Sequence, residues 1–172
     1  MKKLAVLFVT FLVAWSVGYG QTQKSKMVPL KKLTGKEVSS LAKNNFIADF
    51  GNLPNVTWAR MENFDQVTFM KGNVKMTAYY DSEGNLVGTT EPKTFADLPD
   101  KGQKEIKAKY ANYKVEAVTF FDDNEKNDTD MVLWSTQFDD EDLYFAELSK
   151  GASTIVVRVT PSGGVDFFKT LK

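Results

Sequence analysis

Apolar and polar residues alternate along nine short stretches of this chain, a period-2 pattern typical of strands with one buried face. Glycine-rich turns such as Gly72-Asn73 and Gly163-Gly164 separate several of these stretches, as expected between antiparallel strands. The predicted strands span residues 57–62, 65–71, 75–80, 86–90, 115–122, 131–138, 143–148, 153–160 and 165–170.

Two further stretches have helical spacing instead. In the first, Thr34 and Glu37 have the spacing of a capping box, and Gly51 and Pro54 follow as stop signals. The apolar residues expected to face the core of this helix are Val38, Leu41, Ala42, Phe46 and Phe50. The second helix is predicted over residues 97–110, with Pro99 in its first turn and with Ile106 and Tyr110 facing the core.

The order of a helix followed by strands occurs twice, which suggests an internal repeat. Gly84 corresponds to Gly163 at an offset of 79 residues, whereas Val56 corresponds to Val115 at an offset of 59. The second half therefore contains about 20 additional residues, which fall in the acidic region 122–142. We predict a first repeat over residues 34–96 and a second repeat, with an acidic insertion, over residues 97–172.

The beginning of the chain has the pattern of a secretory signal rather than of a folded element. Two lysines precede the apolar run 4–17, and small residues at Gly18 and Gly20 provide a cleavage site. A run of 14 residues is short for a membrane span, so we expect residues 1–20 to be removed and no membrane insertion afterwards. Residues 21–33 are polar and are expected to form a flexible lead. The mature protein is therefore expected in the periplasm or outside the cell.

The composition excludes several classes of function. The chain has no cysteine and no histidine, which excludes disulfides, thiol nucleophiles and imidazole-based catalysis. The 22 basic residues balance 22 acidic ones, and only Arg60 and Arg158 are arginines, so the basic surface of a nucleic-acid binder is absent. No dinucleotide or phosphate-binding loop is present, and we expect no cofactor. The sequence Ser40-Leu41-Ala42-Lys43 matches the Ser-x-x-Lys of penicillin-recognising enzymes, but the supporting motifs are missing.

Several segments together resemble the PepSY-like proteins with a β-lactamase-inhibitor-like fold, which Gram-negative bacteria secrete. The residues that carry this resemblance are Val56-Thr57-Trp58, Val67-Thr68-Phe69, residues 78–85, Asp97-Leu98-Pro99, Ile106 and Tyr110. The resemblance implies an α+β fold, with two tandem helix-plus-antiparallel-sheet repeats joined into one curved sheet and the helices on one face. Related folds bind proteins, including enzymes, on the concave face of the sheet, whereas most PepSY-like members have no known role. The acidic insertion departs from the family pattern.

Period 2 sorts the strand residues between the two faces of such a sheet. If Met76, Ala78 and Tyr80 face the helices, alternate residues point the other way. The predicted protein-binding face consists of Tyr79, Phe145, Arg158, Phe168, Lys75 and Glu147. Tyrosine, phenylalanine and arginine on a rigid sheet suit a protein interface. The alternative is that these are half-buried residues covered by the insertion or by a second subunit. The pattern does not decide toward which face of the sheet Trp58 and Trp134 point.

The insertion contains two acidic clusters, Asp122–Asp130 and Asp139–Asp142, at the two ends of the predicted strand 131–138. Oxygen ligands of this kind suit a hard cation such as Ca²⁺, but the first cluster lacks the EF-hand pattern. The two clusters meet only if the strand between them folds back.

We therefore predict an exported, non-enzymatic module that binds an unidentified protein or peptide on its open sheet face. The alternative is a periplasmic protein that binds a small ligand or a cation. No spacing singles out a pair of carboxylates for catalysis, and no catalytic or metal-binding residue is predicted.

Overall fold

The computed structural model describes Met27 and residues 29–172, so the predicted signal and most of the predicted lead lie outside the described residues. The helices are α1 (Ser40–Phe50), the short 3₁₀ helix η1 (Phe95–Asp97) and α2 (Asp100–Lys109). The strands are β1 (Thr57–Arg60), β2 (Asp65–Lys71), β3 (Val74–Tyr80), β4 (Leu86–Lys93), β5 (Lys114–Asp123), β6 (Met131–Leu133), β7 (Thr136–Phe138), β8 (Leu143–Lys150), β9 (Ser153–Val159) and β10 (Val165–Thr170).

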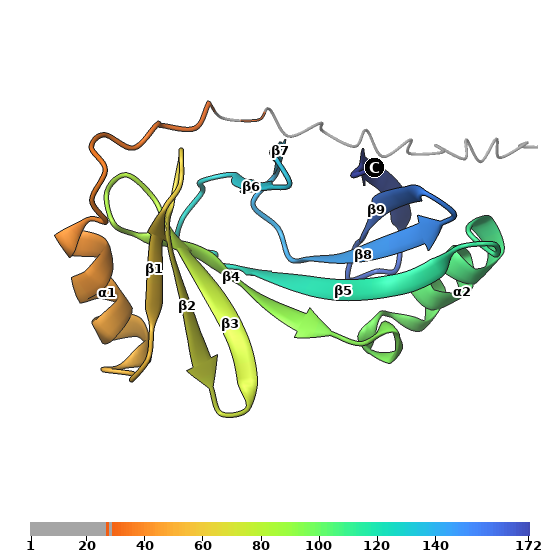
Figure 1. The fold of residues 1–172 in the computed structure, drawn as a ribbon, viewed down its shortest axis with the longest axis horizontal. Coiled ribbons are helices and arrows are strands. Elements are labelled where there is room, and N and C mark those ends of the chain that lie inside the picture. Colours follow the sequence, from red (N-terminus) through yellow and green to blue (C-terminus); the bar gives the residue numbers. More distant parts are fainter. Residues whose placement is uncertain (1–26, 28) are drawn as a thin grey trace, which may run out of the picture.

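Eight strands form one antiparallel sheet in the order β1-β2-β3-β4-β5-β8-β9-β10, and β6 and β7 form a separate hairpin. The two helices lie on one side of the large sheet and the β6–β7 hairpin lies on the other (Figure 1). The prediction of an α+β fold with a large antiparallel sheet and helices on one face is therefore confirmed. The tandem repeat stays a prediction.

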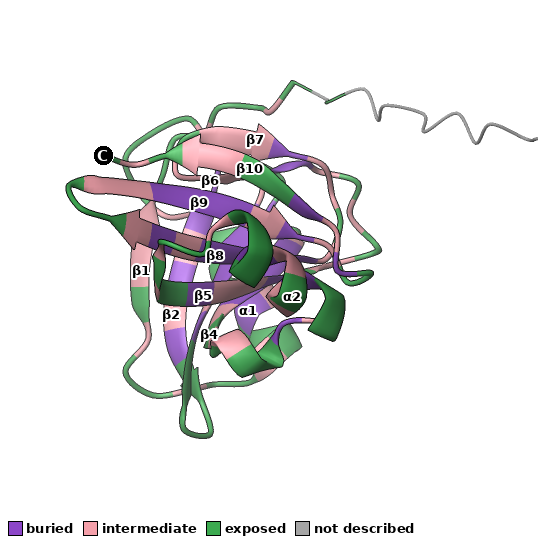
Figure 2. Ribbon diagram, turned by 90° about the vertical axis from the view of Figure 1, so that its right-hand side faces the viewer, coloured by how far each residue is buried: buried purple, intermediate pink, exposed green. Residues whose placement is uncertain are grey.

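Each helix covers its own apolar cluster on the sheet, as the period-2 sorting predicts. Under α1 the buried members are Ala42, Phe46, Val67, Phe69, Met76, Ala78 and Tyr80. Under α2 they are Leu98, Ile106, Val118, Ala146, Leu148, Ile155, Val157, Val159 and Val165. Burial alternates along the strands, and buried segments of β8 and β9 lie behind α2 (Figure 2). Tyr110 packs against the α2 cluster and Trp58 against the α1 cluster, so half-buried Trp58 points toward the helix side of the sheet.

Both halves make the same close contact between a turn glycine and a helix. A Cβ on Gly84, whose φ is +78°, would lie 3.0 Å from the backbone nitrogen of Ala42. A Cβ on Gly163, whose φ is +81°, would lie 2.9 Å from the backbone nitrogen of Gly102. Glycine satisfies both the left-handed backbone and the close approach. These turns therefore determine how near each helix sits to the sheet.

The first helix begins later than the capping-box spacing predicts. Its N-cap is Ser39, whose hydroxyl accepts a hydrogen bond from the Leu41 N–H at 3.1 Å. The Ser39 N–H in turn donates to Asp65 Oδ2 at 2.9 Å, so a residue of β2 positions the start of the helix. Leu41, predicted to be in the core, is 58% exposed, whereas Ala42 and Phe46 on the same helix are buried. A long-range contact overrides the local capping signal here.

The prediction of a single strand over residues 131–138 is wrong, because this segment folds back as the β6–β7 hairpin. Trp134 and Ser135 form its turn with φ values of +48° and +59°, as a tight two-residue hairpin turn requires. Such turns usually carry Asn-Gly or Asp-Gly, so Trp-Ser gives no local turn signal. The Lys169 ammonium donates to the Trp134 carbonyl oxygen, which ties the turn to β10.

The described end of the predicted lead is bound to the sheet. The Leu33 N–H donates to the Glu62 carbonyl oxygen at 2.8 Å, and Lys31 forms an ion pair with Glu83 at 2.7 Å. Leu30 packs on the apolar cluster beneath the hairpin. Residues 30–33 therefore lie beside the end of β1 and beside the β3–β4 turn.

Candidate functional site: the sheet face opposite the helices

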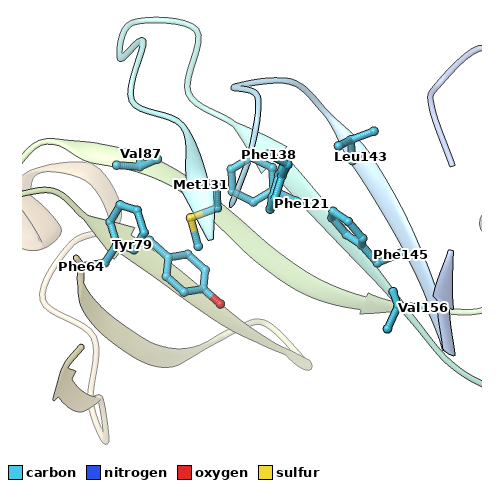
Figure 3. Packing of buried hydrophobic residues seen from close by; sticks show 9 residues of the cluster. All are labelled: Phe64, Tyr79, Val87, Phe121, Met131, Phe138, Leu143, Phe145 and Val156. Atoms are coloured by element: carbon cyan, nitrogen blue, oxygen red, sulfur yellow. The ribbon is translucent and has the colours of Figure 1, made fainter. Parts of the chain in front are cut away.

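A third apolar cluster lies on the sheet face that the helices leave free. Its buried members come from both halves of the sheet and from the hairpin (Figure 3). They are Phe64, Tyr79, Val87, Phe121, Met131, Phe138, Leu143, Phe145 and Val156. Met131 and Phe138 belong to the hairpin, so the acidic insertion supplies an apolar cover for this face.

Phe138 lies at the centre of this cover. Its ring makes edge contacts with Phe121 at 5.3 Å, with Phe145 at 5.1 Å and with Phe168 at 5.9 Å between centroids. Edge-to-face pairs at these separations are favourable beyond their burial of apolar area. Trp134 adds a further edge contact with Phe145 at 5.5 Å. Trp134 is therefore part of the cover.

All six residues predicted for the binding face lie on the side opposite the helices, but their exposure differs. Tyr79 is 9% exposed and Phe145 is fully buried. The Tyr79 hydroxyl lies 3.1 Å from the Thr90 hydroxyl, and burial raises the pKa of this tyrosine. Phe168 is half-buried against Phe145, with 4.9 Å between ring centroids. The exposure assumed for Tyr79 and Phe145 is thus corrected, because the hairpin lies over them.

The three charged residues of the predicted face remain accessible. Lys75 is exposed, and Glu147 and Arg158 are half-buried. Within the described residues none of the three forms an ion pair or a side-chain hydrogen bond. Arg158 stands directly across from Phe145 on β8 and from Asp166 on β10. Glu147 and Arg158 border the covered cluster, whereas Lys75 lies opposite Met70 in the open part of the face.

A row of threonines, which period-2 sorting by itself does not reveal, crosses the open part of this face. The register pairs Thr57 with Thr68, Thr68 with Thr77, and Thr77 with Thr90. The hydroxyls of Thr68 and Thr77 lie 3.1 Å apart, and Met70 beside them is 49% exposed. Only the pairing of strands distant in sequence brings these side chains into one row.

The two acidic clusters of the insertion do converge, because the segment between them folds back. The Asp123 N–H donates to Asp142 Oδ1 at 2.9 Å. Burial, together with the negative charge of Asp140, raises the pKa of Asp123 to about 6. The pKa of Asp140 is also raised, first by burial and then by neighbouring carboxylates. Among the described residues, however, no three acidic groups are arranged to hold a metal ion.

Replacing Asp123 with asparagine should raise stability at pH 7. The folded state holds a proton on Asp123 up to about pH 6, whereas the ordinary pKa is 3.8, so folding loses stability as the pH rises between these values. Because this carboxylate is partly solvated, we expect a gain of about 1 kcal/mol and a melting temperature about 2–4 °C higher.

Thermal unfolding of the wild type and Asp123→Asn between pH 3.5 and 7.5 measures this effect. Between pH 4 and 6 the stability of the variant should decrease less than that of the wild type. The exposed control Asp166→Asn should show the same decrease as the wild type. A variant less stable than wild type at pH 7 would contradict the predicted electrostatic cost.

A cavity of about 310 Å³ lies at the acidic end of this face. The lead, the β1–β2 turn, the β3–β4 turn and the acidic loop all contribute to its wall. Leu30 and Phe64 give it an apolar side, whereas Asp81, Asp128 and Asp130 give it a polar one. Asn127 connects the acidic loop to the β3–β4 turn, because its side-chain amide donates to Asp81 Oδ2 at 3.2 Å and to the Leu86 carbonyl oxygen at 3.0 Å.

No protein-family model and no curated protein matches this chain. Within the described residues, no helix has both the length and the apolar character of a membrane span. Solved structures, by contrast, match its fold. A DUF2874 family protein from Bacteroides uniformis matches with a TM-score of 0.61 at 14% identity, covering 75% of this chain and 86% of its own.

Two other solved structures give the same result. A candidate periplasmic protein from Bacteroides eggerthii matches with a TM-score of 0.63 at 12% identity, over 77% of this chain and 89% of its own. A BLIP-like protein from Bacteroides fragilis matches with a TM-score of 0.59 at 12% identity, over 78% and 87% of the two chains. At these identities the similarity shows a shared BLIP-like fold.

Proposed function

We propose that this protein is an exported, non-enzymatic module that binds a protein or peptide on the sheet face opposite its helices. The observation that carries this proposal is the set of accessible, unpaired charges on that face, namely Lys75, Glu147 and Arg158. The similarity to periplasmic and BLIP-like proteins supports an exported module of this fold.

The charged residues of the face lie far enough apart for a protein contact. Lys75 on β3 and Arg158 on β9 are separated by four strand spacings, or roughly 19 Å across the sheet. Met70 supplies exposed apolar area next to Lys75, which it faces across the β2–β3 pair. Apolar surface with a charged rim is the usual composition of a protein interface.

Tyr79 and Phe145 have a different role in this proposal from the exposed residues. Both lie beneath the hairpin, so a partner docked on the open part contacts Lys75, Glu147, Arg158 and Phe168. Tyr79 and Phe145 then hold the covered half of the face rigid. A partner reaches their rings only if the hairpin is displaced.

Site-specific photocrosslinking tests this face. A photoreactive benzoylphenylalanine replaces Lys75, Glu147 or Arg158, one at a time, in the mature chain added to the envelope of its parent cells. We expect one discrete crosslinked product from these positions and none from the exposed control Lys43, which lies on α1.

A second substitution tests whether the charges contribute to binding. Arg158→Glu should reduce the crosslink formed at position 75 at least tenfold, because a like-charge contact replaces a favourable one. Equal crosslinking from Lys43, or none from the three face positions, would overturn the proposal.

The cavity at the acidic end favours a second candidate function, the binding of a small ligand or cation. Titration calorimetry with Ca²⁺ tests its cation version, with Asp128→Asn, a change in the wall of the cavity, as the comparison. Binding to the wild type that the variant lacks would support this candidate. The absence of heat and of thermal shift in both proteins would remove it.

A further inference from the structure

On the helix side of the sheet, a groove of about 410 Å³ runs between η1, the end of α2 and the start of β5. Its wall is mainly apolar and aromatic and consists of Phe95, Ile106, Lys107, Tyr110, Ala111, Tyr113 and Val115. Only Ile106 is buried, at 3% exposure, and the three rings are half-buried. The end of α2 beside this groove is exposed to solvent (Figure 2).

The rings of this groove offer both apolar area and unused hydroxyls. Tyr110 and Tyr113 form an edge-to-face pair with 5.6 Å between ring centroids. A backbone hydrogen bond of 2.8 Å, from the Tyr113 N–H to the Tyr110 carbonyl oxygen, holds the two residues together. Neither phenol hydroxyl has a hydrogen-bond partner among the described residues. A rigid tyrosine pair with free hydroxyls suits contact with a partner.

Two lysines bracket the groove and carry uncompensated charge. The Lys107 ammonium lies 5.4 Å from the centre of the Phe95 ring, and the Lys150 ammonium lies 5.6 Å from that of Tyr113. Neither lysine forms an ion pair within the described part of the chain. Nearby Glu105 and Glu116 are already paired, with Lys109 and Lys114 respectively, and no carboxylate lines the groove.

The positive potential here is local, because the full chain has 22 basic and 22 acidic residues. Strand β5 begins at Lys114 beside this groove and ends at Asp123 in the acidic clusters. Ten residues of strand span roughly 33 Å, several Debye lengths at physiological ionic strength. The acidic end therefore does not neutralise the groove.

We propose that this groove is a second docking site, which takes an acidic segment of another protein that carries an aromatic or aliphatic side chain. The side chain packs on Phe95, Tyr110 and Tyr113, and flanking carboxylates pair with Lys107 and Lys150. The site lies on the face opposite the one assigned to the proposed function, and it stands whether or not that face binds a partner.

Selection from a random dodecapeptide library on the mature chain tests this site, with counter-selection on Lys107→Glu/Lys150→Glu. The double variant replaces two exposed lysines outside the core, so its melting temperature should stay within about 2 °C of wild type. Enriched peptides should carry net negative charge and at least one aromatic or aliphatic residue. The absence of peptides that depend on the two lysines, or enrichment of basic ones, would overturn the proposal.

Fluorescence anisotropy with a selected peptide then measures the affinity of each variant for that peptide. The double variant should bind it at least tenfold more weakly, and Tyr110→Ala at least threefold more weakly. A charge-matched control, Lys43→Glu/Lys126→Glu, should bind it like the wild type. Loss of affinity in this control equal to that in the groove variant would show a non-specific charge effect and overturn the site.

Sedimentation at low salt shows whether the groove binds another protein or a second copy of this chain. The wild type should remain monomeric at the concentrations used for peptide binding. Self-association that Lys107→Glu/Lys150→Glu abolishes would assign the groove to the acidic end of a second copy and overturn the proposed partner.

Discussion

Replacing Phe138 with alanine should lower the free energy of unfolding by about 3–5 kcal/mol, the usual cost of removing a buried phenylalanine. Phe138 is 1% exposed and contacts Phe121, Phe145 and Phe168 through its ring edge. Its removal leaves a cavity between the hairpin and the sheet. The melting temperature should fall by roughly 10 °C or more for a chain of this size.

Denaturant and thermal unfolding of Phe138→Ala measure this loss, and Phe167→Ala is the matched control. Phe167 is 57% exposed on the edge strand β10, so its truncation should change stability by no more than about 0.5 kcal/mol. If the two variants were equally stable, the hairpin would not be packed on the sheet in solution. Tyr79 and Phe145 would then be accessible to a partner after all.

Replacing Asp65 with alanine should cost about 3 kcal/mol, because it leaves the half-buried Arg60 guanidinium without its carboxylate partner and α1 without its anchor. Asp65 is fully buried, and its two oxygens accept hydrogen bonds from Arg60 Nε at 2.8 Å and Arg60 Nη2 at 2.7 Å. Its Oδ2 also accepts from the Ser39 N–H that starts α1. The variant should therefore lose both an ion pair and the anchor of a helix N-terminus.

A double-mutant cycle with Arg60→Met separates these two contributions. The Asp65→Ala change should cost less in the Arg60→Met background, since no unpaired guanidinium remains, and the residual cost measures the helix anchor. Glu62→Ala is the control, because its ion pair with Lys32 is exposed and should contribute less than about 1 kcal/mol. Identical costs in both backgrounds would show that the two side chains are not coupled.

Burial by the hairpin narrows where on the sheet face a partner can dock. A face with exposed aromatic side chains would bind a partner through apolar anchors. A face with accessible charges, the latter case, binds it through charge complementarity and rim contacts. The accessible Lys75, Glu147 and Arg158 favour the latter. Binding on that part of the face should therefore weaken as salt concentration rises.

Local patterning predicted most of the elements and the facing of their residues. Eight of the nine predicted strands are present, and Ala78, Tyr80, Val157 and Val159 face the helices as period 2 requires. The exceptions depend on contacts between distant residues. Ser39 rather than Thr34 caps α1 because Asp65 accepts its N–H, and the Trp134–Ser135 turn forms without a local turn signature.

In the candidate site, too, local patterning predicted the facing of residues but not the contacts between distant segments. Alternation placed Tyr79 and Phe145 on the face away from the helices, and the structure places them there. Their exposure was predicted wrongly because no local pattern says which segment covers a face. The groove beside α2 was not predicted either, since Lys107 and Lys150 meet its rings from elements more than 40 residues apart.

The residue pattern is therefore enough to establish an α+β chain, the two faces of its sheet and, through the absence of cysteine and histidine, a narrow range of chemistry. These properties follow from periodicity and composition, which act over a few residues or over the whole chain. The folding back of the insertion, which covers Phe145 with Phe138, depends instead on contacts made in the folded chain. Covering a sheet face depends on which apolar surface lies within reach once the chain is folded, and that is a property of long-range contacts.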